Sequence, residues 1–246
     1  MTHAKTTISF MVVGLAITPF LASAGEWGIG AATGYFQPPQ SGIEGQHLAL
    51  PYFTYQGERL NIDLGAISYT LSQSEAIKIS LEGELRFEGY EPDDSPALSG
   101  MEKRSPSFDA GIGVASPVLD GEMKVMILGD LIGTHEGYEA RAQYQIQYMF
   151  NRWVFAPAVG VSWLDKSLVD YYYGVQQSET TPNRTYYSGN ASTNPFVELG
   201  FGYSFSDHLE LTGGVKYVRL GKRITASPIV DQEYDASAFS ALQYKF

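Results

Sequence analysis

Apolar and polar side chains alternate strictly through residues 138–150. One parity carries Tyr138, Ala140, Ala142, Tyr144, Ile146, Tyr148 and Phe150, and the other carries Glu139, Arg141, Gln143, Gln145, Gln147 and Met149. Only a β-strand, with its two-residue period, separates these sets. At about 3.3 Å per residue the segment would span about 43 Å, much longer than a strand of a soluble domain. Tyrosines at both ends and alanines between them are typical of a strand that crosses a bilayer with its polar row facing a lumen.

Similar segments along the chain predict an all-β fold, a transmembrane antiparallel up-and-down β-barrel. The predicted strands are 27–36, 47–56, 60–66, 77–87, 107–116, 122–130, 138–150, 153–165, 169–176, 195–205, 209–219 and 235–246. The weakest is 169–176. Counting it gives about 12 strands, an even number as in bacterial single-chain barrels, and 10 is the alternative if another weak segment also fails. On this count the short turn at 151–152 falls on the outer side, where loops are usually longer.

The N-terminus predicts export. Lys5 precedes an apolar run over residues 8–21, and Ala22, Ser23 and Ala24 form a small-residue cleavage site. This pattern predicts a secretory signal peptide over residues 1–24 and a single barrel domain over residues 25–246. The expected location is the outer membrane of a Gram-negative cell, with outer-membrane lipid as the surrounding partner.

Composition narrows the function. The net charge of the 246-residue chain is −11, which argues against nucleic acid as a partner. The chain has no cysteine, so disulfides, a thiol nucleophile and a thiolate metal site are all excluded. No cofactor is expected.

Nine charged residues fall on the polar parity of their strands. Four of them share one face of the segment 77–87, where a charge facing lipid would cost about 2–4 kcal/mol near the midplane, so they are expected to face the lumen. In an open pore they would tune ion selectivity, and in a closed barrel they would form structural ion pairs, which is the favoured interpretation. The nine are Lys78, Glu82, Glu84, Arg86, Glu139, Arg141, Glu198, Glu210 and Lys216.

Catalysis is considered because some outer-membrane barrels hydrolyse lipid esters with serine and histidine. Outside the predicted signal peptide the histidines are His47, His135 and His208. His135 lies beside Asp130 and Glu136, which could supply metal ligands, but no metal-binding spacing recurs elsewhere. The interpretation is therefore a non-enzymatic protein with no catalytic or metal site.

The C-terminus provides a second signature of a membrane barrel. Leu242, Tyr244 and the final residue, Phe246, share the apolar parity of the last predicted strand. This pattern looks like the terminal signal that the barrel assembly machinery reads, so that machinery is a predicted partner.

Six segments together carry a resemblance to a known family. They are Tyr171-Tyr172-Tyr173-Gly174-Val175, Tyr186-Tyr187-Ser188-Gly189-Asn190-Ala191, Ala226-Ser227-Pro228-Ile229, Tyr244-Lys245-Phe246, Leu50-Pro51-Tyr52-Phe53-Thr54-Tyr55 and Gly100-Met101-Glu102-Lys103-Arg104. In this order they resemble the MipA/OmpV family of outer-membrane proteins. The resemblance implies an outer-membrane barrel and a scaffold that links murein-degrading and murein-synthesising enzymes. A narrow solute channel or a surface adhesin is the alternative, and a lipid acyl hydrolase is a distant one.

Overall fold

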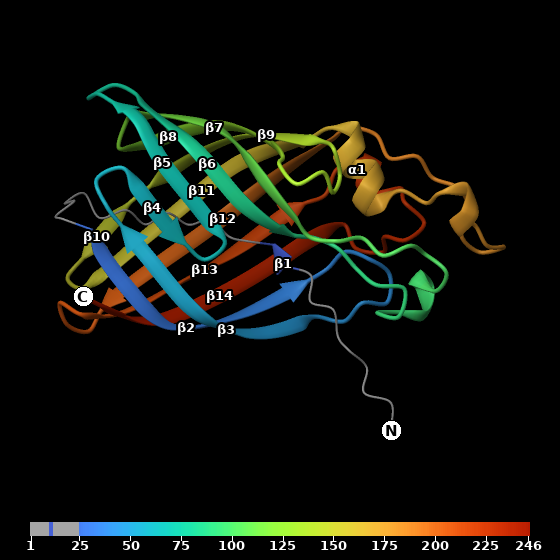
Figure 1. The fold of residues 1–246 in the computed structure, drawn as a ribbon, viewed down its shortest axis with the longest axis horizontal. Helices are drawn as coiled ribbons and strands as arrows, with labels where there is room; N and C mark the ends of the chain where they lie inside the picture. Colours follow the sequence, from blue (N-terminus) through green and yellow to red (C-terminus); the bar gives the residue numbers. More distant parts are fainter. Residues whose placement is uncertain (1–9, 12–24) are drawn as a thin grey trace.

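Twelve antiparallel strands of the computed structural model, which describes residues 10–11 and 25–246, pair into one closed ring (Figure 1). Neighbours in sequence pair with each other, and β14 closes the ring against β2. The strands are β2 (Glu26–Gln37), β3 (Gln46–Gln56), β4 (Leu60–Asp63), β5 (Ala66–Gln73), β6 (Lys78–Phe87), β7 (Ser107–Val118), β8 (Gly121–Asp130), β9 (Tyr138–Ile146), β11 (Trp153–Leu164), β12 (Ser192–Ser204), β13 (Leu209–Arg219) and β14 (Tyr234–Lys245). The predicted up-and-down barrel is confirmed.

Two short strands lie beside this ring. β10 (Tyr148–Phe150) continues β9 after a break at Gln147 and pairs with β11. β1 (Phe10–Met11) pairs with β6 at Phe87 and Arg86. Apart from residues 10–11, the predicted signal peptide lies outside the described residues. No described helix is both long and apolar enough to cross a membrane.

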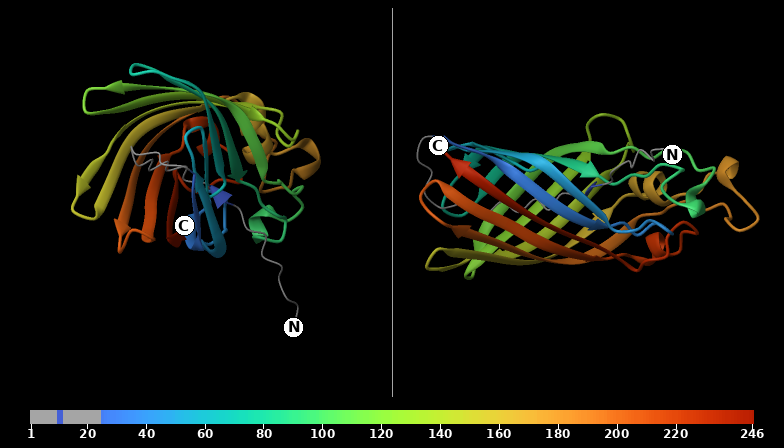
Figure 2. Two further views of the ribbon diagram at one scale, coloured as in Figure 1. Left: turned by 60° about the vertical axis from the view of Figure 1, so that its left-hand side comes forward. Right: turned by 90° about the horizontal axis from the view of Figure 1, so that it is seen from below.

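The connections differ between the two ends of the barrel. Residues 57–59, 74–77, 119–120, 151–152 and 205–208 form short turns at one end, and Phe246 N–H donates to Trp27 O at that same end. Residues 38–45, 88–106, 131–137, 165–191 and 220–233 form loops at the other end, where α1 (Lys166–Tyr173) also lies (Figure 2). In outer-membrane barrels the short turns are periplasmic and the long loops extracellular, so we call the two ends periplasmic and outer.

The outer wall of the barrel is apolar, with aromatic residues near both ends. At the periplasmic end the ring centroids of Trp153 and Tyr203 are 4.6 Å apart, and at the outer end those of Tyr138 and Trp163 are 5.4 Å apart. Between these levels, side chains such as Ile127 are more than half exposed. Two aromatic belts with an apolar band between them match a bilayer and its two interfaces.

The strand count of 12 is right, but one predicted strand is wrong and one strand of the structure was not predicted. The segment 169–176 is not a strand: most of it belongs to helix α1, because Asp165 accepts hydrogen bonds from the N–H groups of Ser167 and Leu168 and so caps the helix. The missing strand is β5, which follows a turn at Gly65, where φ is +68°. With β5 included, the turn at 151–152 lies at the periplasmic end, as short turns should.

Candidate functional site: a capped, charged lumen

Helix α1 fills the outer mouth of the barrel. Leu168, Val169, Tyr172 and Tyr173 are 0–3% exposed, because the spacing of four residues places the pairs 168/172 and 169/173 on one face of the helix. They pack against inward residues at the outer ends of the strands and against the loop 220–233. This cluster also contains Leu164, Phe196, Val218, Leu220 and Ile224. Apolar packing therefore closes the barrel at this end.

Four of the loops pack around a second apolar cluster above the barrel. Its buried members are Ile43, Tyr90, Leu98, Met101, Val175 and Ile229. Ser95 Oγ donates to Ser41 O at 2.7 Å, and Ser227 Oγ donates to Tyr173 O at 2.6 Å, so the loops are also joined by hydrogen bonds. We call the four loops together with α1 the outer cap.

Two buried arginines hold the outer cap together. Arg104 donates to Tyr171 O at 2.6 Å and to both carboxylate oxygens of Glu179, at 2.9 and 3.1 Å. Arg184 donates to the carbonyl oxygens of Ala97, Ser99 and Glu179 at 2.7–3.0 Å. Burial raises the pKa of Glu179, but hydrogen bonds from the backbone N–H groups of Gln176 and Glu102 and the charge of Arg104 lower it more, so the pKa lies below its ordinary value.

Beneath the cap, charged side chains of neighbouring strands form ion pairs inside the lumen. Arg86 donates to Glu139 at 2.6 Å and to Asp109 at 2.8 Å, and it lies 3.3 Å from Glu88. Arg141 joins Glu139 at 2.8 Å to Glu84 at 3.1 Å. These side chains are 1–16% exposed. We call these six residues the lumen network, and it connects β6, β7 and β9, which lie within four neighbouring strands of the wall.

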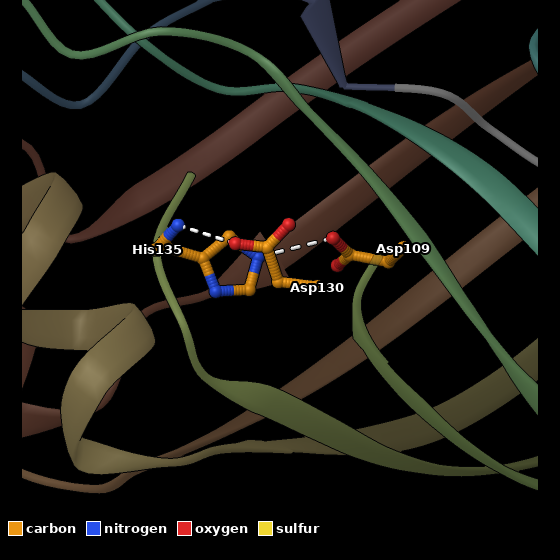
Figure 3. Close-up of side chains that lie close together, drawn as sticks. All are labelled: Asp109, Asp130 and His135. Atoms are coloured by element: carbon orange, nitrogen blue, oxygen red, sulfur yellow. Dashed lines mark hydrogen bonds and ion pairs between the residues drawn. The ribbon is translucent and has the colours of Figure 1, made fainter. Parts of the chain in front are cut away.

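Asp109, Asp130 and His135 also lie close together, with candidate metal-ligand atoms within 4.8 Å of one another (Figure 3). His135 Nε2 is 3.0 Å from Asp109 Oδ1, and His135 Nδ1 accepts from Gly137 N–H at 3.0 Å. The Asp130 carboxylate accepts from four backbone N–H groups of the loop 131–137. Since these hydrogen bonds already engage both ring nitrogens of His135 and both Asp130 oxygens, the cluster fits a role in folding the loop. Glu136, which the sequence places next to His135, is not part of it.

The same contacts show whether a histidine could act as the general base of a serine hydrolase. A general base for serine needs a ring nitrogen that faces the hydroxyl. Ser107 Oγ donates to Asp109 Oδ1 at 2.9 Å and not to His135, while His47 and His208 are exposed. Among the described residues, no histidine ring nitrogen is hydrogen-bonded to a serine hydroxyl.

Two cavities in the described part of the lumen lie on either side of the lumen network. The outer one measures about 40 Å³ and is lined by residues including Glu88, Lys216 and Asp235. The periplasmic one, which we call the chamber, measures about 380 Å³ and extends to Asp120 and Gly121 at a periplasmic turn. The small volume of the outer cavity and the apolar packing above it are typical of a pocket rather than of an open pore.

The structure places the nine predicted lumen charges in four settings. Glu84, Arg86, Glu139 and Arg141 belong to the lumen network. Lys78 and Glu82 line the chamber, where Glu82 pairs with Lys124 at 2.8 Å, and Glu210 pairs with Lys245 at 2.6 Å near the periplasmic end.

Glu198 and Lys216 form the fourth setting. They face each other across β12 and β13, but within the described chain Lys216 forms no ion pair shorter than 4.0 Å, and its Nζ lies 4.7 Å from the Phe196 ring centroid. Sequence reasoning missed Asp109, Glu88 and Lys124, although the inward parity of β7 and β8 could have indicated the first and the last. Leu242, Tyr244 and Phe246 are 46–70% exposed on the outer wall, and their recognition during assembly stays a prediction.

Several known proteins are similar to this chain along most of its length. Residues 29–246 match the family described as MltA-interacting protein MipA. The outer membrane protein YiaT of Escherichia coli K12 is 28% identical over 96% of this chain and 98% of that protein. OmpV of Vibrio cholerae is 27% identical over 80% and 78%, and the MltA-interacting protein of Escherichia coli K12 is 23% identical over 98% and 100%. The NanC porin structure aligns at a TM-score of 0.44 and 10% identity, over 89% of this chain and 100% of that one.

Proposed function

The chain belongs to the MltA-interacting protein family MipA, and we propose that it is an outer-membrane scaffold that binds murein-degrading and murein-synthesising enzymes at its periplasmic end. One relative is named for its interaction with MltA. Enzymes that act on murein work on the periplasmic side of the outer membrane, so the periplasmic turns are the surface that such partners can reach.

The observation that carries this proposal is a pair of exposed apolar side chains at that end. Leu119 is 92% exposed in the turn between β7 and β8, and Met149 is 80% exposed on β10. Because Gly121 pairs with Ile146, the Leu119 turn lies beside the tip that carries Met149. Met149 keeps the inward parity of its strand, which faces away from lipid. We call Leu119 and Met149 the periplasmic lip.

The backbone of Leu119 strengthens this argument. Its φ is +53°, in the left-handed region that costs a leucine about 1–2 kcal/mol. Glycine or asparagine would fit such a turn without that cost. A strained, almost fully exposed leucine contributes nothing to the barrel, and contact with a partner would give it a role.

The closed outer end favours a scaffold over the runner-up, a narrow solute channel. Apolar side chains of α1 fill the mouth, and beneath them the lumen network pairs charged side chains of β6, β7 and β9 inside the lumen. A conducting path would have to open the apolar packing of α1. Wild-type protein should therefore remain silent in a planar bilayer. Discrete conductance steps whose ion selectivity changes in a Glu82→Lys, Glu84→Lys variant would favour the channel instead.

Binding provides the direct test. Residues 25–246 in lipid nanodiscs should bind a purified lytic transglycosylase of the MltA class, measured by biolayer interferometry. Leu119→Asn relieves the backbone strain and removes the apolar contact, so it should weaken binding about tenfold or more while the barrel becomes no less stable. The matched control is Leu131→Asn, at a residue 66% exposed next to the outer end. Binding that falls equally in both variants, or in neither, would refute the role of the periplasmic lip.

A further inference from the structure

The chamber exists because β7 adds little bulk to the lumen. Among the residues of β7, Ala115 and Pro117 line the chamber, and Ala115 pairs with Lys78 of β6 on one side and with Lys124 of β8 on the other. The wall is therefore low between two rows of longer polar side chains. At about 380 Å³ the chamber is within the range of about 300–1,000 Å³ that is usual for small-molecule sites. Its lining should therefore indicate which class of ligand it binds.

Three glutamines lie in a row along one side of the chamber. Gln143 and Gln145 occupy alternate positions of β9, and Gln147 directly follows its last residue, so that all three line the chamber. No side-chain hydrogen bond joins these amides to another residue that the structure describes. Each amide carries two N–H donors and one carbonyl acceptor. We call these residues the glutamine row, and it presents unused hydrogen-bonding groups to whatever occupies the chamber.

The spacing of the glutamine row matches that of an extended peptide. Alternate residues of a strand are about 6.6–6.8 Å apart along its axis. In an extended peptide the N–H and C=O of one residue point to the same side and those of the next residue to the opposite side, so the groups on one side repeat at that same interval. A glutamine amide can accept from such an N–H and donate to the C=O of the same residue. The three glutamines therefore match the first, third and fifth residues of an extended segment.

Unpaired charges at the periplasmic end of the chamber favour a basic ligand. Asp120 and Glu122 line this end, and neither forms an ion pair with another described residue. Deeper in the chamber, by contrast, Glu82 is 2.8 Å from Lys124. Within the described lining the unpaired acidic groups outnumber the one unpaired cation, Lys78. A basic side chain that enters from the periplasm would therefore meet two carboxylates without a partner.

From these observations we infer that the chamber binds an extended peptide segment of a periplasmic polypeptide. About five small residues would lie along the glutamine row, because the volume leaves little room beyond an extended backbone. A basic residue of the same segment would pair with Asp120 and Glu122 at the entrance. Neither Leu119 nor Met149 lines the chamber, so this site is separate from the periplasmic lip and does not rest on the scaffold proposed above.

A labelled peptide tests occupancy of the chamber directly. The probe has five alanines followed by two lysines and carries fluorescein at the lysine end, and its anisotropy is measured with residues 25–246 in phosphatidylcholine nanodiscs. Ala115→Phe fills the chamber with a ring, so it should weaken binding about tenfold or more. Val114→Phe is the matched control, because Val114 is 41% exposed on the lipid-facing side and the same ring stays outside. No binding by the wild-type protein, or equal binding by the two variants, would overturn the peptide site.

The glutamine row is tested by a variant of its middle residue. Gln145→Leu keeps most of the side-chain volume but removes the amide, so it should weaken binding about fivefold or more, because two hydrogen bonds to the peptide are lost. Gln56→Leu, at the periplasmic end of β3 and outside the chamber lining, should leave binding unchanged. The same loss in both variants, or a loss in neither, would overturn pairing with the glutamine row.

Two competitors test the class of ligand. Unlabelled probe peptide should displace the labelled one, and the same peptide with glutamates in place of its lysines should compete about tenfold less well. Chitotetraose, a neutral saccharide, should not displace the probe. Equal competition by the glutamate peptide would overturn the selection of a basic residue, and displacement by chitotetraose would assign the chamber to saccharides instead of peptides.

Discussion

Arg86 is the residue on which the lumen network depends most, and its removal gives a quantitative test. The guanidinium pairs with Glu88, Asp109 and Glu139 at 2.6–3.3 Å, and the side chains of these four residues are 1–10% exposed. Arg86→Met would retain most of the buried volume but leave three buried carboxylates without this cation. Breaking a buried ion pair in this way costs about 3–5 kcal/mol, because the remaining charge stays desolvated. We expect the free energy of unfolding to fall by that amount.

The assay is urea unfolding of the refolded protein in phospholipid vesicles, followed by the fluorescence of its three tryptophans. Arg152→Met is the matched control, because Arg152 is exposed and its guanidinium makes one contact, to Phe205 O at 2.6 Å. The control should lose no more than about 1 kcal/mol. Glu88→Gln in the Arg86→Met background should recover about 1–3 kcal/mol, since it removes a carboxylate whose partner is gone. A loss for Arg86→Met that equals the control would show that the network does not stabilise the barrel.

Three further predictions concern the outer cap. Because the folded-state pKa of Glu179 is lowered, its contribution to the stability of the outer cap is fully present above the ordinary glutamate pKa of about 4.3 and is lost as pH falls through the folded-state pKa. The near-ultraviolet circular dichroism of the cap tyrosines should therefore decrease in acid. Glu179→Gln should abolish that acid dependence. Asp165→Ala removes the cap of α1 and should cost about 1 kcal/mol, seen as a lower melting point of the same signal, whereas Asp207→Ala in an exposed turn should leave it unchanged. Gly189→Ala would place a Cβ 2.5 Å from backbone atoms of Asp170. It should therefore loosen the cap and speed proteolysis of the loop 165–191, while the barrel strands stay protected. An unchanged near-ultraviolet signal of the cap tyrosines in that variant would contradict the close packing.

Regular alternation made most of the barrel readable from the sequence. On β6, Leu81 and Leu85 lie on the lipid side and Glu82 and Glu84 on the lumen side, as the parity predicts, because a charge facing lipid is too costly. The hairpin of β4 and β5 was not predicted from the sequence, for a physical reason. Its turn at Leu64 and Gly65 contains no proline or asparagine, and apolar and polar residues keep alternating on both sides of it. The strand 60–66 therefore absorbed the turn, and β5 went unassigned.

Helix α1 shows where local pattern fails. Three consecutive tyrosines have high β propensity, yet α1 is helical. Asp165 caps it, and a helix places residues four apart on the same face, where they are buried together in the barrel mouth. The lumen network was equally out of reach in detail. Parity gives the face of Arg86, but its partner Glu139 is 53 residues away, and their meeting depends on the order and register of strands around a closed ring. The outer cap, which joins loops far apart in the sequence, had no local signal at all.

The arginine contacts of the outer cap affect how freely its exposed side chains can vary. Arg184 binds Ala97, Ser99 and Glu179 through their carbonyl oxygens, which every amino acid possesses. The side chains at Ala97 and Ser99 can therefore change without loss of these bonds, so the cell can vary its exposed chemistry while the shape of the cap persists. An antibody raised against the folded surface would recognise a discontinuous epitope assembled from several loops. Such an antibody would bind weakly to a peptide copied from any single loop.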